Sequence, residues 1–105
     1  MNVRIDIPKQ KIAKFCQRHK IRRLALFGSV LRGDFAPASD VDILVTFEPD
    51  TRIGYIGLAG LEIELTELLG RKTDLHTLEG VERSRNWLLR KEILGSAEKI
   101  YEQTR

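Results

Sequence analysis

The chain has 105 residues, 42% of them hydrophobic and 31% charged, with a formal net charge of +3 at pH 7, which is ordinary for one small soluble domain spanning residues 1–105. No apolar run approaches the roughly 18–20 residues of a membrane helix, and the first residues lack the apolar stretch of a signal peptide. The single cysteine, Cys16, excludes an internal disulfide and a zinc site of several cysteines, so we expect a cytoplasmic protein without membrane association.

The basic residues are concentrated at the front of the chain. Residues 1–23 carry eight lysines or arginines and one acidic residue, Asp6, whereas the rest of the chain carries ten basic and fourteen acidic residues. A basic segment of this kind is typical of a surface for nucleic acid or an acidic partner, and also of a helix face that contacts only water. We favour the solvated helix face.

The first predicted element is an amphipathic helix over residues 8–20. Pro8 suits the first turn of a helix, where its missing N–H is not needed, and apolar residues recur after it at helical spacing. Cys16 and His19 fall on this apolar stripe, so we interpret both as packing residues rather than reactive ones. The apolar run over residues 24–27, which a glycine ends, predicts a short buried strand.

The next stretch predicts a break in regular structure and then a second strand. Residues 29–32 are expected to form one or two helical turns, and residues 34–39 have the composition of a loop. Residues 41–47 are apolar and rich in β-branched side chains, which predicts a strand that Pro49 ends.

The second half of the chain alternates helices and strands. Residues 53–69 carry leucines on one face and glutamates among the polar positions, which predicts a helix that ends at Gly70. We expect a third strand over residues 72–78, another helix over 81–94 and a short final strand over 99–101. The predicted fold is therefore α+β, a small mixed β-sheet of about three or four strands packed with helices.

Three aspartates are candidates for a metal site. Asp40 and Asp42 open the second strand, where residues i and i+2 point to the same side about 7 Å apart. Their mutual repulsion favours a cation between them, and oxygen ligands suit Mg²⁺ or Mn²⁺. If its strand pairs beside the second one, Asp74 converges on the same face, and such a trio can hold two ions for phosphoryl transfer. His76 shares the strand face of Asp74, but we expect a packed or solvent-facing histidine.

A glycine and a serine follow the first strand. Gly28 lacks a Cβ and lets the backbone approach a ligand closely, and the short helix after it would direct N–H groups at an anion. Ser29 adds a hydroxyl, and Arg32 lies three residues further on the same helix face, within reach of a phosphate. A Gly-Ser pair after a strand and an Asp-x-Asp pair are each common in turns and on surfaces that have no function. Together, at the spacing G-S-x10-D-x-D, they predict a nucleoside triphosphate bound as its metal complex.

The stretch GSVLRGDFAPASDVDILV resembles the signature of the minimal nucleotidyltransferases of the DNA polymerase beta superfamily. The similarity covers most of the chain, including KTDLHT and the end ILGSAEKIY. It implies a polymerase-beta-like nucleotidyltransferase fold in which Gly28 and Ser29 contact the triphosphate. Asp40, Asp42 and Asp74 would be the catalytic metal ligands, although only strand context and order identify the last of them.

The resemblance also implies a reaction and a partner. A minimal nucleotidyltransferase moves a nucleoside monophosphate, here AMP from ATP, onto a hydroxyl with Mg²⁺ as cofactor, two ions being expected. Because the chain has no room for the second domain that completes the acceptor site in larger relatives, we expect a partner or a second copy to supply that wall. Minimal members resemble antitoxins that silence a HEPN-domain ribonuclease toxin by transferring AMP to its tyrosine, and we expect this function.

Two alternatives remain open at this point. The chain could be a non-catalytic module that binds a partner or RNA through its basic front, or a nucleotidyltransferase for small molecules such as antibiotics. The missing second domain disfavours the small-molecule enzyme. Detection of AMP on a tyrosine of the partner would separate the expected function from both alternatives.

Overall fold

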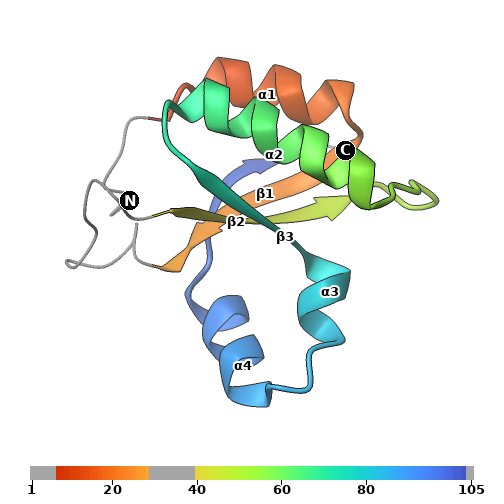
Figure 1. Cartoon of the computed structure of the whole chain (residues 1–105), viewed down its shortest axis with the longest axis vertical. Coiled ribbons are helices and arrows are strands. Elements are labelled where there is room, and N and C mark those ends of the chain that lie inside the picture. Colours follow the sequence, from red (N-terminus) through yellow and green to blue (C-terminus); the bar gives the residue numbers. More distant parts are fainter. Residues whose placement is uncertain (1–6, 29–39, 104–105) are drawn as a thin grey trace.

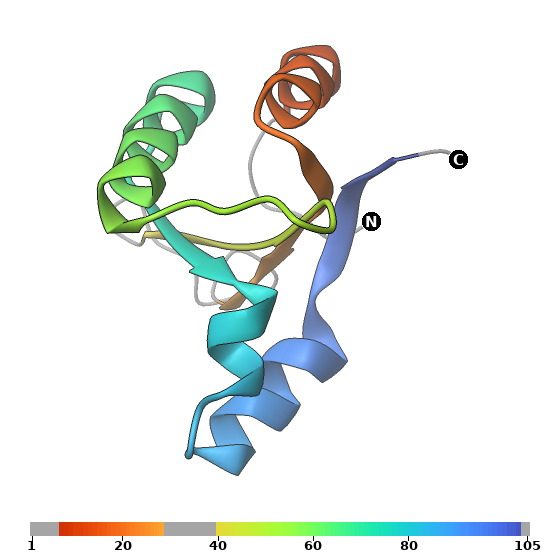
Figure 2. The same cartoon turned by 90° about the vertical axis from the view of Figure 1, so that its right-hand side faces the viewer.

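A four-stranded β-sheet lies between two layers of helices (Figures 1 and 2). The structure is a computed structural model that describes residues 7–28 and 40–103. Its elements are α1 (Lys9–Arg18), β1 (Ile21–Phe27), β2 (Val41–Phe47), α2 (Tyr55–Leu69), β3 (Thr73–Thr77), α3 (Leu78–Glu82), α4 (Trp87–Ser96) and β4 (Glu98–Glu102). The predicted α+β fold is confirmed. Among the described residues, no helix is long and apolar enough to span a bilayer.

The sheet is mixed, with the strand order β3-β2-β1-β4. β1 pairs antiparallel with both β2 and β4, whereas β2 and β3 run parallel. Parallel neighbours need a crossover connection, and α2 provides it. The beginnings of β2 and β3 therefore lie side by side at one end of the sheet, next to the end of β1.

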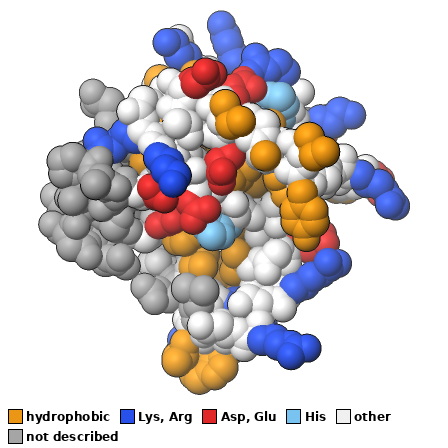
Figure 3. Space-filling model, in the orientation of Figure 1, with side chains coloured by type: hydrophobic (Ala, Val, Ile, Leu, Met, Phe, Trp, Pro, Cys, Tyr) orange, Lys and Arg blue, Asp and Glu red, His pale blue; other side chains and the backbone are white. Residues whose placement is uncertain are grey.

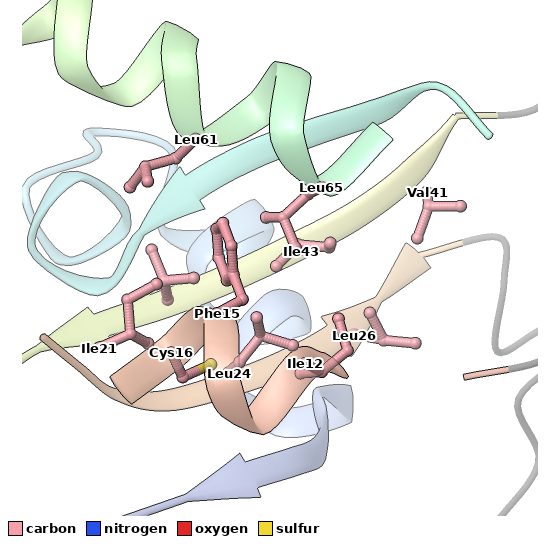
Figure 4. Packing of buried hydrophobic residues seen from close by; sticks show 11 residues of the cluster. Ile12, Phe15, Cys16, Ile21, Leu24, Leu26, Val41, Ile43, Leu61 and Leu65 are labelled. Carbon is pink, nitrogen blue, oxygen red and sulfur yellow. The ribbon is translucent and has the colours of Figure 1, made fainter. Parts of the chain in front are cut away.

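The larger hydrophobic core lies between the sheet and the helices α1 and α2 (Figure 2). Phe15 and Cys16 of α1 and Leu65 of α2 are fully buried against the apolar side chains of β1 and β2, as Figure 4 shows. α2 ends at Gly70, which adopts a left-handed conformation with a φ of 70° and donates its N–H to Thr66 O. The predicted stop at this glycine is confirmed.

A second, smaller hydrophobic cluster lies on the opposite face of the sheet, under α3 and α4. It consists of four buried residues, Phe27, Leu44, Val81 and Ile93. Alternation along β2 explains the division, because residues 41, 43 and 45 belong to the larger core and residue 44 to the smaller one. Asp42 therefore shares the face of α3 and α4.

The predicted single helix over residues 81–94 is wrong, because the chain forms the two helices α3 and α4 there. α3 starts directly after Thr77, whose side-chain oxygen accepts a hydrogen bond from Gly80 N–H at 3.0 Å. After α3, Ser84 Oγ accepts a hydrogen bond from Asn86 N–H at 3.2 Å. Local bonds of this kind compete with helical ones, so the chain turns before α4 begins.

The first strand is longer than predicted, since β1 begins at Ile21 rather than at residue 24. The register shifts between Ile21 and Arg23, and Arg23 Nη2 donates to Glu102 Oε2 on β4 at 2.7 Å. Pairing on both sides thus brings two exposed arginines into a strand that local apolarity alone does not reveal. The turns predicted over residues 29–32 and the loop over 34–39 lie outside the described residues.

Candidate active site

Two of the predicted aspartates are direct neighbours on adjacent strands. Asp42 of β2 and Asp74 of β3 are paired in the parallel register, so both carboxylates point to the face of α3 and α4. Two like charges placed opposite each other destabilise a sheet unless a positive group lies between them. The prediction that the third strand would bring Asp74 beside Asp42 is confirmed.

His76 joins these carboxylates. Its Nε2 atom lies 3.2 Å from Asp74 Oδ2 and 4.0 Å from Asp42 Oδ1. The imidazole also packs edge-on against the Phe27 ring, with 5.2 Å between the ring centroids and 63° between the planes. The sequence favoured a packed or solvent-facing histidine at this position, whereas the structure places His76 in the acidic group. Strand parity with Asp74 was the signal that could identify it.

Gly28 lies against Asp42 at the end of β1. Its backbone φ is +78°, a left-handed value that residues other than glycine rarely adopt. A Cβ at this position would collide with Asp42 Oδ2. The register explains the approach, because the preceding residue, Phe27, pairs with Asp42. The absence of a side chain at Gly28 therefore leaves the space that the Asp42 carboxylate occupies.

Of the other predicted site residues, Asp40 alone is among the described residues, and the structure does not bring it into this group. Asp40 is half-buried and lies one residue before β2, and it does not belong to the cluster of ligand atoms formed by Asp42, Asp74 and His76. Ser29 and Arg32 lie outside the described residues. The phosphate-binding, metal-binding and catalytic roles of these three residues, like those of Gly28, Asp42 and Asp74, stay predictions.

A cleft of about 770 Å³ opens in front of the paired carboxylates. Gly28, Asp42, Asp74 and His76 line it, together with side chains from α2, α3 and α4. Figure 3 shows a histidine next to a group of acidic side chains near the middle of this view. The volume lies within the usual range of about 300–1,000 Å³ for small-molecule and cofactor sites.

Helix α2 holds the outer edge of β3, the edge away from β2, on which the described residues place no further strand. Glu62 Oε2 accepts a hydrogen bond from Leu75 N–H at 2.8 Å, and Thr66 Oγ1 accepts one from Thr73 N–H at 3.1 Å. These side chains satisfy backbone donors that would otherwise be free at the sheet edge. Glu62 thereby fixes the strand that carries Asp74, a role that no local sequence pattern indicates.

The donor set suits a divalent cation. One ligand atom from each of Asp42, Asp74 and His76 lies within 4.8 Å of the others. Carboxylate oxygens are the ligands of Mg²⁺ and Mn²⁺, and imidazole nitrogen binds transition ions. A positive ion at this point would also offset the repulsion between the paired carboxylates. The residues therefore fit the metal that the acidic motif predicts.

Comparison with known proteins identifies the family. The family model described as "Nucleotidyltransferase domain" matches residues 9–100. The chain belongs to this family. Within the family, the chain is 34% identical to MJ0435 of Methanocaldococcus jannaschii over 73 aligned residues. The aligned region is 70% of this chain and 76% of MJ0435. The name of MJ0435 assigns it, provisionally, to the protein adenylyltransferases. The predicted membership and the assignment as a nucleotidyltransferase are confirmed.

Solved structures show the same fold. A toxin–antitoxin complex with AMP-PNP contains a chain with a TM-score of 0.70 and 24% identity, over 93% of this nucleotidyltransferase and 76% of that chain. A complex of a tri-AMPylated Shewanella oneidensis HEPN toxin with its MNT antitoxin matches with a TM-score of 0.61 and 24% identity, over 90% and 70%. The nucleotidyltransferase fold of the described residues is thereby established.

Proposed function

We propose that this nucleotidyltransferase transfers AMP from ATP to a tyrosine hydroxyl of a HEPN-domain toxin and so acts as its antitoxin. The observation that carries the proposal is the pairing of Asp42 and Asp74 beside Gly28 at the floor of the cleft. Further support comes from the protein adenylyltransferase name of MJ0435 and from the AMPylated HEPN toxin bound to an antitoxin of the same fold.

Each residue of the site has a task in this reaction. Asp42 and Asp74, with Asp40 as the third predicted ligand, would hold Mg²⁺, which neutralises charge on the triphosphate. The Gly28 backbone and Ser29 steady the leaving phosphates. The tyrosine oxygen attacks the α-phosphorus in line, the bond between that phosphorus and the bridging oxygen breaks, and pyrophosphate leaves. Asp74 acts either as the base that accepts the proton of the tyrosine hydroxyl or only as a ligand of the metal. Positioning and charge neutralisation supply the acceleration.

The surface around the cleft favours a protein as acceptor. Helix α2 exposes Tyr55 and Ile56, which are 92% and 91% exposed, and α4 exposes Trp87 and Leu88. In Figure 3, hydrophobic side chains are visible over α2 and at the lower end of α4. Large apolar side chains exposed on the helices that frame a site are typical of a docking surface for another protein. A small-molecule acceptor has no need for them.

Substitution of Asp42 by asparagine tests the reaction. Asp42→Asn keeps the size of the side chain and removes its charge, so we expect AMP transfer to fall by roughly a hundredfold or more while the fold persists. The protein is incubated with Mg²⁺ and each labelled nucleoside triphosphate, with and without the co-purifying HEPN protein. Mass spectrometry then measures AMP on the partner's tyrosines.

Asp50→Asn is the matched control, because Asp50 lies in the turn after β2 with a φ of 68°, which asparagine tolerates. This variant should transfer AMP at the wild-type rate. Labelling by Asp42→Asn at the wild-type level would refute the proposal. A partner that is inhibited but carries no AMP would instead favour a non-catalytic binding module.

A further inference from the structure

The three possible metal ligands Asp42, Asp74 and His76 include one nitrogen donor, the imidazole of His76. The structure places the His76 imidazole, rather than a further carboxylate, beside Asp42 and Asp74. We propose that His76 is a metal ligand, and that the site consequently binds Mn²⁺ in preference to Mg²⁺. This inference rests on the proposed function in that it concerns the cation of the same reaction.

The distances agree with ligands of one ion. Metal–ligand bonds of about 2.1 Å place two ligands at right angles roughly 3 Å apart. His76 Nε2 lies 3.2 Å from Asp74 Oδ2 and 4.0 Å from Asp42 Oδ1, so it faces both carboxylates at once. A hydrogen bond from the single Nε2 proton would be directed at one oxygen, whereas an ion between the three groups contacts all of them.

The imidazole is held in place by neighbours on three elements. β3 carries both Asp74 and His76 on one face, and its outer edge is fixed by Glu62 of α2. The Phe27 ring at the end of β1 packs against the imidazole. The His76 side chain retains 35% exposure on the side of the cleft, where an ion could enter. Ligands on paired strands need little rearrangement to bind a metal.

The identity of the donor predicts the selectivity. Mg²⁺ prefers oxygen ligands and keeps its waters, so one nearby imidazole contributes little to its binding. First-row transition ions accept imidazole nitrogen readily. An Asp42–Asp74–His76 site should therefore bind Mn²⁺ at least about tenfold more tightly than Mg²⁺, and loss of the imidazole should remove most of that difference.

Electron–nuclear double resonance of bound Mn²⁺ tests the ligation directly. The full chain is labelled with ¹⁵N-histidine and loaded with Mn²⁺ alone, without nucleotide or acceptor, and the spectrum is searched for the coupling of a directly bound nitrogen. His76→Gln should lose the coupling and weaken Mn²⁺ binding by about tenfold or more, with little change for Mg²⁺. His19→Gln is the matched control, because His19 lies at the end of α1 and contacts Glu64 at 3.1 Å; this variant should keep the coupling.

The outcomes separate this inference from the proposed function. A wild-type spectrum without nitrogen coupling, or equal Mn²⁺ affinity in wild type and His76→Gln, overturns the ligation by His76. If His76→Gln weakens Mn²⁺ and Mg²⁺ equally, the imidazole only orients Asp74 and the inference also fails. Neither result affects AMP transfer measured on a partner. Conversely, a nitrogen coupling without any transfer would overturn the proposed function alone.

Discussion

Gly28 and Asp42 show how a single residue can decide the geometry of the site. Gly28 meets two separate requirements: its φ is left-handed at +78°, and the Asp42 carboxylate occupies the space where a Cβ would stand. The first requirement concerns the backbone, and the second concerns the space beside a neighbouring strand. A substitution at this position therefore acts on stability and on the carboxylate at once.

Gly28→Ala should lower the free energy of unfolding by about 1–3 kcal/mol, because alanine is strained at a left-handed φ. It should also abolish AMP transfer, because the new Cβ displaces the Asp42 carboxylate. Gly70→Ala separates the two effects, since Gly70 has a φ of +70° but open space where a Cβ would stand. The free energy of unfolding of Gly70→Ala should fall by about 1 kcal/mol, and this variant should still transfer AMP. Urea unfolding and the transfer assay measure both quantities. Transfer by Gly28→Ala at the wild-type rate would contradict the proposed importance of this contact.

At the scale of elements, the position of β3 depends on helix α2. Among the strands of residues 7–28 and 40–103, β3 lies at the edge of the sheet beside β2. Side chains of α2 accept hydrogen bonds from two of its outward N–H groups. The residues Asp74 and His76 lie on this strand, so any displacement of its edge moves the proposed metal ligands. The helix thus does more than cover the core, because it fixes a functional strand from the side.

Glu62→Ala should free Leu75 N–H and accelerate its hydrogen exchange, and it should lower the free energy of unfolding by about 1–2 kcal/mol through the lost charge-assisted hydrogen bond. Glu67→Ala is the control, because Glu67 lies exposed on the same helix and should change stability by at most about 0.5 kcal/mol. Amide exchange by nuclear magnetic resonance gives the local effect. Unchanged exchange at Leu75 in Glu62→Ala would show that α2 does not hold the edge.

At the scale of the whole molecule, the two faces of the sheet differ in size and task. Helices α1 and α2 cover one face of the sheet and α3 and α4 the other, as Figure 2 shows. The first face holds the larger core, and the second holds the smaller cluster next to the cleft, which α2 also lines. Cys16 lies fully buried in the larger core, which confirms its interpretation as a packing residue. Burial raises the pKa of the Cys16 thiol to about 12. The thiol is thus a natural probe for opening of that core.

The native protein at pH 8 should react with a disulfide reagent only as fast as the core opens, because the neutral buried thiol is not the nucleophile. In concentrated guanidinium chloride one thiol should react at once. Release of the chromophore measures both rates, and the native rate should rise with urea in parallel with unfolding. Rapid modification of the native chain would contradict the packing described for α1.

Local sequence patterns predict most of the helices and strands of this protein, and they predict its family. The apolar patterns of β2 and α2 and the stop at Gly70 are properties of contiguous residues, and the structure confirms each of them. The split between α3 and α4 was missed, since it depends on competing hydrogen bonds of Thr77 and Ser84. Such bonds have little effect on hydrophobic periodicity.

The sequence by itself determined the fold class, the nucleotidyltransferase motif and the expectation of an acidic metal site. Only the tertiary structure decided that His76 joins Asp42 and Asp74, and that Gly28 makes room for a carboxylate. Both outcomes depend on the register of strands that are distant along the chain. The apolar alternation within a strand fixes which face each side chain takes, but which residues of two strands stand opposite each other is decided when the strands pair in the folded sheet.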